Sequence, residues 1–438
     1  MSSPSYCPQH RSPPATQQQQ QRTTGQSLTS RAWTLAQTVL LTQRFYTAAA
    51  AAILAFEVLI NIAIIQRVAY TEIDWQAYMQ QIAAVAEGER NYARIRGDTG
   101  PLVYPAGFVW VYRALWAATD GGADVRRAQY IFMGVYLATL VCVLAIYRTA
   151  RVPVLWLVPL ALSRRLHSLY VLRLFNDAVA MLPAYLALAT LCAGRLRWSG
   201  AALSAGIAVK MNVQLMLPGA AFVWWRCGGL RMVATQTAAV LAIQALVALP
   251  FLCTHPSEYF ARAFEYSRRF DFKWTVNWRF VGEHIFGSSI WAASLLTAHL
   301  LLLLYLGLRV WPRLSGRSAS SIIRKGMTLH RHHTRVDAEE AAAVVLSANF
   351  VGVVCARTLH YQFYAWYAHT LPFLLYRSRL PLPAQLALWL AIEYAWNVYP
   401  STIASSLLLL AAHCVILATI LRWRQLQPRH EEVHLKSA

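Results

Sequence analysis

Acidic side chains are scarce in this sequence, and paired cysteines are missing. The chain has 19 Asp and Glu against 40 Lys and Arg, and charged residues make up 13% of its 438 residues, about half the share of a soluble domain. None of the seven cysteines forms a CxxC pair, so the sequence indicates neither a metal cluster nor a disulfide framework. It also contains no Asn-x-Ser/Thr acceptor, which excludes N-linked glycans.

Long apolar stretches dominate what is present. Hydrophobic residues supply 57% of the chain, and apolar stretches recur at about twenty residues, the length at which a helix crosses the hydrocarbon core of a bilayer. The clearest are 46–65, 130–147, 232–253, 290–310 and 403–421. Soluble cores rarely contain so many spans of this length. We therefore expect an all-α polytopic membrane protein.

The positive charge is unevenly distributed. No acid precedes Glu57, and residues 309–335 contain seven Arg or Lys and no acid. In a nucleic-acid-binding protein such runs would flank base-stacking aromatics on a soluble fold, whereas here they flank apolar spans. By the positive-inside rule they are predicted to be cytosolic loops. Membrane lipids, and not nucleic acid, are the partners that this pattern indicates.

The predicted organisation is one membrane domain with polar ends. Residues 1–42 include a run of five Gln and are expected to form a disordered cytosolic tail. No short apolar segment near the start fits a cleavable signal peptide. The other predicted parts are the membrane domain at 43–424, its first and second luminal loops at 68–100 and 254–285, its basic cytosolic loop at 311–337, and a cytosolic tail at 425–438.

About twelve membrane passes would connect these loops. Their predicted positions are 45–67, 101–118, 128–147, 152–166, 170–193, 200–225, 232–253, 287–310, 338–356, 359–377, 383–400 and 402–421. The segment 152–166 is short, and Gly and Lys residues interrupt 200–225. For either segment, the alternative to a membrane span is a re-entrant loop. No internal repeat is found, so an inverted-repeat transporter gains no support.

A polar and aromatic block follows the first span. It contains Asp74 and Asp98, together with Trp75 and Tyr78. Carboxylates accept protons from sugar hydroxyls, and aromatic rings stack on the apolar face of a pyranose. An acceptor hydroxyl ionises far above neutral pH, so a positioned carboxylate such as Asp74 would help to remove its proton. The alternative is an interfacial helix whose acids are merely solvated.

Ionisable residues inside apolar spans form a second group, because charge in hydrocarbon is costly. Arg173 and Asp177 are four residues apart, which permits an ion pair along one helix, and Lys210 interrupts another span. We interpret these residues as ligands for a phosphate or a sugar, with helix–helix contacts as the alternative. Glu57, in the first span, is more typical of a helix–helix contact.

A third group combines cations with aromatic rings near residue 360. Arg357, His360, Tyr361 and Tyr364 would share one face of a helix. At the luminal mouth of a span, Arg and His would bind a phosphate, and Tyr would stack on a sugar or an isoprenoid. An aromatic belt at the membrane interface is the alternative.

The segment 268–280 has the same mixture of cations and aromatic rings. Its candidate binding residues are Trp274, Asn277 and Arg279. The alternative is an amphipathic helix that lies on the membrane surface.

Seven blocks of the chain, in order, resemble those of a known enzyme family. They are 71–79, 97–107, 167–177, 209–213, 274–280, 360–369 and 399–402. Over about residues 45 to 405 the chain is similar to the dolichyl-phosphate-mannose-dependent α-1,3-mannosyltransferases of N-glycan assembly. The N-terminal tail, the 311–337 loop and the C-terminal end lie outside the resemblance.

The resemblance implies a multipass enzyme of the GT-C superfamily in the endoplasmic reticulum membrane, with a luminal active site. Such an enzyme would move mannose from dolichyl-phosphate-mannose, in α-1,3 linkage and with inversion, to the five-mannose oligosaccharide on dolichyl diphosphate. Asp74 occupies the place of the acid that related enzymes keep on the first luminal loop as the base. Asp98 resembles a second acid before a Pro-Leu step. No metal or other cofactor is implied.

Two alternatives stay open at this point. An enzyme with the same donor would act on another branch of the oligosaccharide or on a GPI precursor. A lipid or sugar transporter would be a different class of protein. Its carboxylates would lie at mid-membrane between repeats, whereas Asp74 and Asp98 are predicted to lie in a loop.

Overall fold

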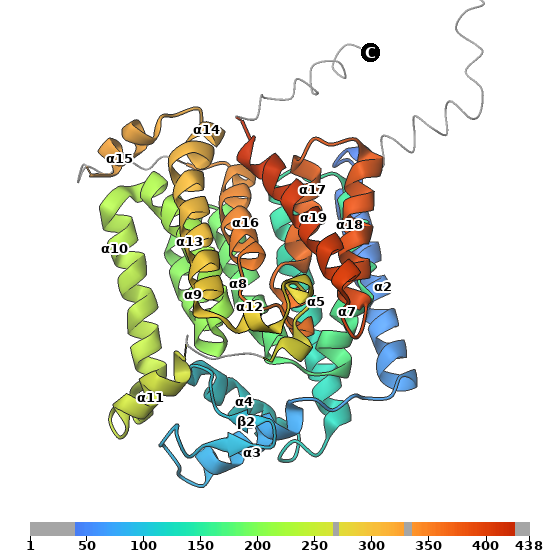
Figure 1. Ribbon diagram of the computed structural model, residues 1–438, viewed down its shortest axis with the longest axis vertical. Coiled ribbons are helices and arrows are strands. Elements are labelled where there is room, and N and C mark those ends of the chain that lie inside the picture. Colours follow the sequence, from blue (N-terminus) through green and yellow to red (C-terminus); the bar gives the residue numbers. More distant parts are fainter. Residues whose placement is uncertain (1–39, 266–270, 328–334, 425–438) are drawn as a thin grey trace, which may run out of the picture.

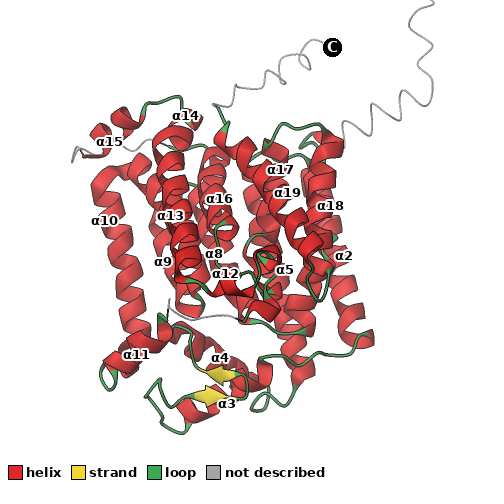
Figure 2. Ribbon diagram, viewed as in Figure 1, coloured by secondary structure: helices red, strands yellow, loops and turns green. Residues whose placement is uncertain are grey.

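The computed structural model describes residues 40–265, 271–327 and 335–424, which form a bundle of helices (Figure 1). Nearly all of the regular structure is helical (Figure 2), and the described strands β1 (Arg96–Gly97) and β2 (Gly100–Pro101) pair as a short antiparallel hairpin. The all-α class is therefore confirmed. The predicted C-terminal tail, almost all of the N-terminal tail, and residues 266–270 and 328–334 of the two predicted loops lie outside the described residues.

Five segments of the described chain are long and apolar enough to cross a membrane, and a sixth qualifies if a bent helix pair counts as one span. They are Tyr46–Arg67, Val125–Thr149, Met211–Leu252, Ser289–Leu314 and Ile403–Leu421, with Arg164–Leu172 and Asn176–Cys192 as the bent pair. These helices stand side by side in the bundle (Figure 1). The chain is a polytopic membrane protein, as its composition predicts.

Helix α16 forms the centre of the bundle. The bundle helices are α2 (Tyr46–Arg67), α5 (Val125–Thr149), α8 (Asn176–Cys192), α9 (Leu196–Val209), α10 (Leu217–Leu252), α13 (Ser289–Tyr305), α16 (Ala338–Val354), α18 (Leu382–Asn397) and α19 (Ile403–Leu421). Every α16 residue from Glu339 to Val353 is buried. Gly219 of α10 lies so close that a β-carbon there would be 2.6 Å from the Cα of Val345. Such close approach through small residues is typical of membrane helices.

A layer of short elements covers one end of the bundle, and we call it the cap. It consists of β1, β2, α3 (Trp75–Ala86), α4 (Ala106–Ala118) and α11 (Pro256–Ala263), at the bottom of Figure 1. The predicted span 101–118 is wrong, because α4 has only 13 residues, about 20 Å of helix, and lies in the cap. The indole of Trp110 fixes it there by donating to the carbonyl oxygen of Val247 at 2.7 Å.

The loss of that span reverses the direction of α5. Arg126, near the start of α5, donates to the carbonyl of Ile65 at the end of α2. Arg148, near the end of α5, donates to the hydroxyl of Thr47 at the start of α2. The two helices are therefore antiparallel, whereas the predicted alternation made them parallel. The excursion between them covers 68–124, which is longer than the predicted loop at 68–100.

Helix α10 is two helices that meet at Gly228 and Gly229. Gly229 has φ 59° and ψ −157°, which a residue with a β-carbon rarely adopts. Before the break, Trp224 donates to Ser199 Oγ at 2.8 Å; after it, the side chain of Gln236 accepts from the amide of Gly200 at 3.0 Å. Both partners lie near the start of α9, so the chain reverses at the two glycines.

Four other predicted spans are broken and not continuous; one of them, 170–193, breaks between Leu172 and Asn176. The segment 152–166 contains η1 (Val154–Leu157), α6 (Val158–Ala161) and α7 (Arg164–His167), and η2 (Ser168–Leu172) follows. The segment 359–377 contains η7 (Tyr361–Trp366), η8 (Ala368–Thr370) and α17 (Leu371–Arg377), and 200–225 is broken at Lys210 before η3 (Met211–Met216). Prolines begin several of these pieces, because proline lacks the amide that a helix interior needs.

The predicted role of Glu57 as a helix–helix contact is confirmed. Its carboxylate is fully buried in α2, and Oε2 lies 2.7 Å from His167 Nε2 of α7. Asn61, one turn along α2, also donates to this carboxylate, at 3.1 Å. The contact fixes the broken segment against the first span.

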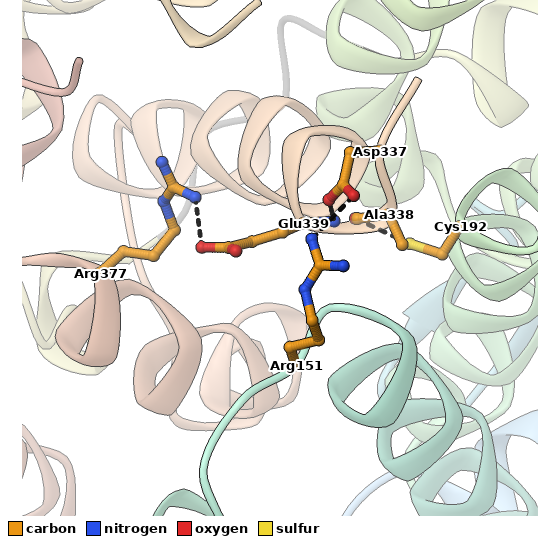
Figure 3. A network of polar contacts seen from close by, with 6 residues as sticks. All are labelled: Arg151, Cys192, Asp337, Ala338, Glu339 and Arg377. Carbon is orange, nitrogen blue, oxygen red and sulfur yellow. Dashed lines mark hydrogen bonds and ion pairs between the residues drawn. The ribbon is translucent and has the colours of Figure 1, made fainter. Parts of the chain in front are cut away.

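The end opposite the cap carries a polar network that holds the start of α16 (Figure 3). Asp337 accepts from the amide of Glu339 at 2.9 Å and pairs with Arg151 at 2.8 Å. Glu339 in turn pairs with Arg377 at 2.6 Å. These contacts join the ends of α5, α16 and α17.

We call this the basic end. Besides the start of α2 and the end of α19 it carries η6 (Leu306–Val310), α14 (Trp311–Leu314) and α15 (Ala319–Met327), at the top of Figure 1. The described part of the acid-free stretch, 309–327, thus lies at the end opposite Asp74. This separation follows the positive-inside pattern, in which basic loops remain on the cytosolic side.

We expect cysteines placed at Ser320 and Ser257 to react from opposite sides of the membrane. Both positions are exposed, Ser320 on α15 at the basic end and Ser257 on α11 in the cap. Each cysteine is introduced alone, after replacement of the native cysteines. An impermeant thiol reagent added to sealed microsomes should then label only the residue 320 variant. Labelling of both from the same side would contradict this orientation.

Candidate active site

Asp74 lies directly before α3, at the face of the cap that meets the bundle. Its Oδ2 accepts a hydrogen bond from the hydroxyl of Tyr78 at 3.2 Å. Burial raises the pKa of the Asp74 carboxyl, while the Lys210 ammonium and hydrogen bonds from Tyr78 and Thr99 oppose that rise. The nearby Asp177 carboxylate raises this pKa further. Asp74 is therefore a half-buried base candidate in reach of a buried cation.

Lys210 and Asp177 form a buried ion pair behind Asp74. The ammonium of Lys210 lies 2.6 Å from Asp177 Oδ2 and donates to Asn176 Oδ1 at 2.9 Å. The indole of Trp366 donates to the other oxygen of Asp177. Asp177 is fully buried, so these donors satisfy a carboxylate that water does not reach.

Helix breaks bring these groups together. Helix α9 ends at Val209, and Lys210 is extended, with φ −154° and ψ 134°. The chain between η2 and α8 bends by 111°, through Leu174 at φ 50°. Asp177 consequently stands in the first turn of α8, where the helix dipole favours a carboxylate.

An aromatic layer connects the ion pair to both sides of the site. The Lys210 ammonium lies 5.6 Å from the centre of the Tyr104 ring and 5.3 Å from that of Phe363. Tyr104 packs edge-on against Tyr78 at 5.9 Å. On the other side, Phe363 stacks on Trp366 at 3.9 Å and on His360 at 5.3 Å between ring centres. Asp74, Lys210, Asp177 and His360 thus belong to one cluster.

The remaining candidates of the first predicted group surround Asp74 without joining it. Trp75 is buried, and its indole donates to the carbonyl oxygen of Gly122 at 3.0 Å. Asp98 is exposed at the tip of the β1–β2 hairpin, where the side chain of Gln80 donates to it at 2.7 Å. The alternative of a solvated interfacial helix does not hold for Tyr78, which is buried, or for half-buried Asp74.

The ion pair that the sequence permits between Arg173 and Asp177 does not form. Asp177 pairs with Lys210, and Arg173 donates instead to the hydroxyl of Ser168. The helix on which the four-residue spacing depends is broken between these two residues.

The common helical face predicted for Arg357, His360, Tyr361 and Tyr364 is also wrong. Arg357 lies in a turn, and the two tyrosines belong to the 3₁₀ segment η7. The hydroxyl of Tyr361 donates to the carbonyl oxygen of Val398 at 2.7 Å, and that of Tyr364 donates to the carboxylate of Glu393. Both tyrosines therefore anchor α18, and only His360 reaches the cluster.

Trp274, Asn277 and Arg279 lie in short turns and not in an amphipathic helix. The elements here are η4 (Phe272–Trp274), η5 (Arg279–Val281) and α12 (Glu283–Gly287). Asn277 donates to the carbonyl oxygen of Ala356 and accepts from the amide of Leu359, both at 2.9 Å. Arg279 donates to the carbonyl of Phe272. Asn277 thus positions the 356–360 turn, Arg279 holds its own segment together, and exposed Trp274 stacks on Tyr399.

Several residues that complete the cluster were not predicted from the sequence. They are Thr99, Tyr104, Asn176, Phe363 and Trp366. Tyr104 and Trp366 lie inside the resembling blocks, and Asn176 precedes Asp177, so their neighbours were the available signal. These residues are connected through Lys210, which lies more than thirty residues away from each of them in the sequence.

A pocket of about 430 Å³ opens beside α3 on the cap. Polar and aromatic side chains share its lining, among them Gln76, Gln80 and Trp116. Glu72 and Trp75 also line it, and they lie on either side of Asp74 in the sequence. This mixture is suited to a carbohydrate, because amides bond hydroxyl groups and the indole offers a flat apolar face.

A sequence model described as "ALG3 protein" matches residues 51–406 of this chain. The chain belongs to the ALG3 family. The matched range contains all seven blocks of the resemblance, which is thereby confirmed.

Curated members of the ALG3 family resemble the chain over most of its length. The human relative is 42% identical over 404 residues, which cover 91% of each chain. The Neurospora crassa relative is 44% identical over 356 residues, 78% of this chain and 80% of its own. The Arabidopsis thaliana relative is 40% identical over 401 residues, 88% and 90% respectively. Each is named Dol-P-Man:Man(5)GlcNAc(2)-PP-Dol alpha-1,3-mannosyltransferase. No solved structure matches the chain.

Proposed function

We propose that this protein transfers mannose from dolichyl-phosphate-mannose, in α-1,3 linkage, to Man5GlcNAc2 on dolichyl diphosphate. The names of its family relatives, which match along most of the chain, support this substrate pair. The observation that carries the proposal is the cluster at the cap, where a half-buried carboxylate, a buried ion pair and His360 meet at the end of a membrane bundle. Two lipid-anchored substrates require a site at that position.

The acceptor hydroxyl would lose its proton to Asp74. Tyr78 and Thr99 donate to the carboxylate of Asp74, which fixes its orientation for the acceptor. As the hydroxyl loses its proton, its oxygen attacks the anomeric carbon from the face opposite the phosphate. The mannose–phosphate bond breaks, dolichyl phosphate leaves with the electron pair, and the anomeric configuration inverts.

The leaving phosphate would be stabilised by Arg357 and His360. Lys210 already lies beside Asp177 and acts on Asp74, so its charge is balanced before any substrate binds. His360 stacks on the far side of Phe363 from this pair, and Arg357 precedes it in the same turn. Preorganised cations aimed at developing charge lower the barrier without reorganisation. In this proposal they perform the role that a metal ion has in other transferases.

We expect Arg357→Ala and His360→Ala each to lower turnover by at least about tenfold, with a smaller loss of donor affinity. Charge grows on the phosphate only as the sugar leaves, so the cations act mainly in the transition state. The measurement is a titration of dolichyl-phosphate-mannose that yields kcat and KM separately. Arg94→Ala, an exposed arginine of the cap, is the matched control. Unchanged turnover in both variants would assign Arg357 and His360 to membrane anchoring instead.

The pocket beside α3 would hold mannose residues of the acceptor. It adjoins Asp74 in the chain through Glu72 and Trp75, and the amides of Gln76 and Gln80 in its lining can bond sugar hydroxyls. We expect Gln76→Ala to raise the KM for the acceptor while the KM for the donor stays unchanged. A rise in the donor KM alone would place the donor sugar there.

The proposed membrane architecture is of the GT-C type in the endoplasmic reticulum, with the cap in the lumen. Twelve passes are obtained if α4 is left out and α10 counts as two spans around Gly228 and Gly229. Supporting this count, α2 begins and α19 ends at the basic end (Figure 1), which an even number of passes requires.

Purified protein assayed with labelled dolichyl-phosphate-mannose tests the function. Man5GlcNAc2 on dolichyl diphosphate should be extended by one mannose that an α-1,3-specific analysis of linkage identifies. Longer oligosaccharides and a GPI precursor are the comparison acceptors. Preferential transfer to either of these would replace the proposed acceptor.

A further inference from the structure

A second pocket lies at the basic end, on the opposite side of the bundle from the cap. It has a volume of about 310 Å³, and α10, η6, α14 and α15 line it with apolar residues. Phe222, Trp225 and Trp311 supply much of its wall. Two further lining residues, Leu308 and Ile323, are 43% and 49% exposed, so the pocket is open to the surroundings of the protein.

The wall that α15 contributes is firmly held. The indole of Trp225 donates to the carbonyl oxygen of Ile322 at 3.0 Å. Where α10 reverses, Gly229 approaches α15 so closely that a β-carbon would be 2.5 Å from the carbonyl oxygen of Gly326. The pocket is therefore a built feature of the fold and not a gap beneath a loosely placed helix.

Cationic side chains follow the pocket lining in the sequence. Arg309 comes directly after Leu308, Arg313 after Pro312, and Arg324 after Ile323; all three arginines are exposed. No acidic residue occurs in 309–335. An apolar hollow bordered by positive charge is complementary to a molecule with an apolar chain and an anionic head.

We propose that this pocket binds an acyl chain of an anionic phospholipid, whose headgroup contacts Arg309, Arg313 and Arg324. Basic segments at a membrane surface attract anionic lipids, and an apolar hollow holds an acyl chain through close packing contacts. The site lies at the end opposite Asp74, so its lipid is neither the mannose donor nor the acceptor. It joins α10, α14 and α15 at the turn where α10 reverses.

Lipid titration of the purified, delipidated full chain tests this site by native mass spectrometry. Phosphatidylserine and phosphatidylcholine with the same acyl chains are added separately, and bound lipid is counted. We expect wild-type protein to retain one phosphatidylserine more tightly than phosphatidylcholine. Gly307→Leu should weaken that binding by at least about tenfold, because a β-carbon at Gly307 has open space, 3.8 Å from the Trp311 ring, and the larger side chain enters the pocket.

A variant that lacks the three positive charges tests headgroup binding separately and leaves the apolar pocket unchanged. The triple change Arg309→Gln, Arg313→Gln and Arg324→Gln should reduce phosphatidylserine binding to the level of phosphatidylcholine. Arg422→Gln with Arg424→Gln, both exposed beyond α19, is the matched control and should leave it unchanged. Equal binding of the two lipids by wild type would overturn the proposal, as would undiminished binding by Gly307→Leu. Displacement of phosphatidylserine by dolichyl phosphate would also overturn it, by making the pocket a substrate site.

Discussion

Replacement of Asp74 by Asn is expected to lower the rate of mannose transfer about a hundred- to ten-thousand-fold. The amide cannot accept the acceptor's proton, yet its oxygen can still accept the hydrogen bond that Tyr78 donates. Folding and expression should therefore be preserved. The measurement is the initial rate of purified protein at saturating concentrations of both substrates.

Glu87→Gln is the matched control for this variant, because Glu87 is an exposed carboxylate at the other end of α3. It should transfer mannose at the wild-type rate. A near wild-type rate for Asp74→Asn would remove Asp74 from the role of base, and the carboxylate of Asp98 would be the next to test.

The pH dependence of the reaction should report the environment of Asp74. Burial raises the pKa of this carboxyl, and a base acts only when it is ionised. Activity should therefore fall as the pH is lowered through that raised pKa, at a higher pH than for an exposed aspartate. Lys210 opposes the rise, so a variant without this cation should lose activity at a still higher pH.

Lys210→Met is expected to reduce both stability and activity. It leaves the fully buried Asp177 without its cation, and breaking a buried pair on one side typically costs about 3–5 kcal/mol. Thermal unfolding of the purified protein in detergent measures the stability, and the transfer assay measures the rate. Lys273→Met, which removes an exposed lysine, is the control and should change neither.

The double variant Lys210→Met and Asp177→Asn separates the two effects. Removing both charges avoids the uncompensated carboxylate, so part of the lost stability should return. Activity should recover only in part, because the loss of Lys210 affects the pKa of Asp74 more than the loss of the opposing Asp177 charge does. An unchanged unfolding temperature in the single variant would show that the pair contributes nothing to the fold.

The sequence predicted the helical membrane class well and the course of the chain less well. Apolar length alone identifies α2, α5, α13 and α19, because each needs about twenty consecutive apolar residues. It also marked 101–118 as a span, since α4 is apolar through packing against the bundle and not through contact with lipid. The turn between 200–225 and 232–253 was predicted and lies at Gly228 and Gly229, whereas the break at Lys210, which divides 200–225, was predicted only as an interruption.

Much of the site was likewise predicted, but its pairings were not. Asp74, Asp177, Lys210 and His360 were all selected as charged or titratable residues beside apolar spans. Their partners were assigned by helical spacing, which fails wherever a helix breaks, as it does between Arg173 and Asp177. The Lys210–Asp177 pair joins two separate helix breaks, and no local pattern in either segment indicates the other.

The position of α4 has a consequence for how the chain enters the membrane during synthesis. With the cap in the lumen, as proposed, the whole of 68–124 is translocated between α2 and α5, including an apolar helix that the bilayer must not retain. Its 13 residues are short enough to pass. A few added leucines would let it lodge as a span, and every later helix would then insert in the opposite direction, with the basic end on the wrong side. The shortness of α4 is thus a determinant of biogenesis as well as of the site.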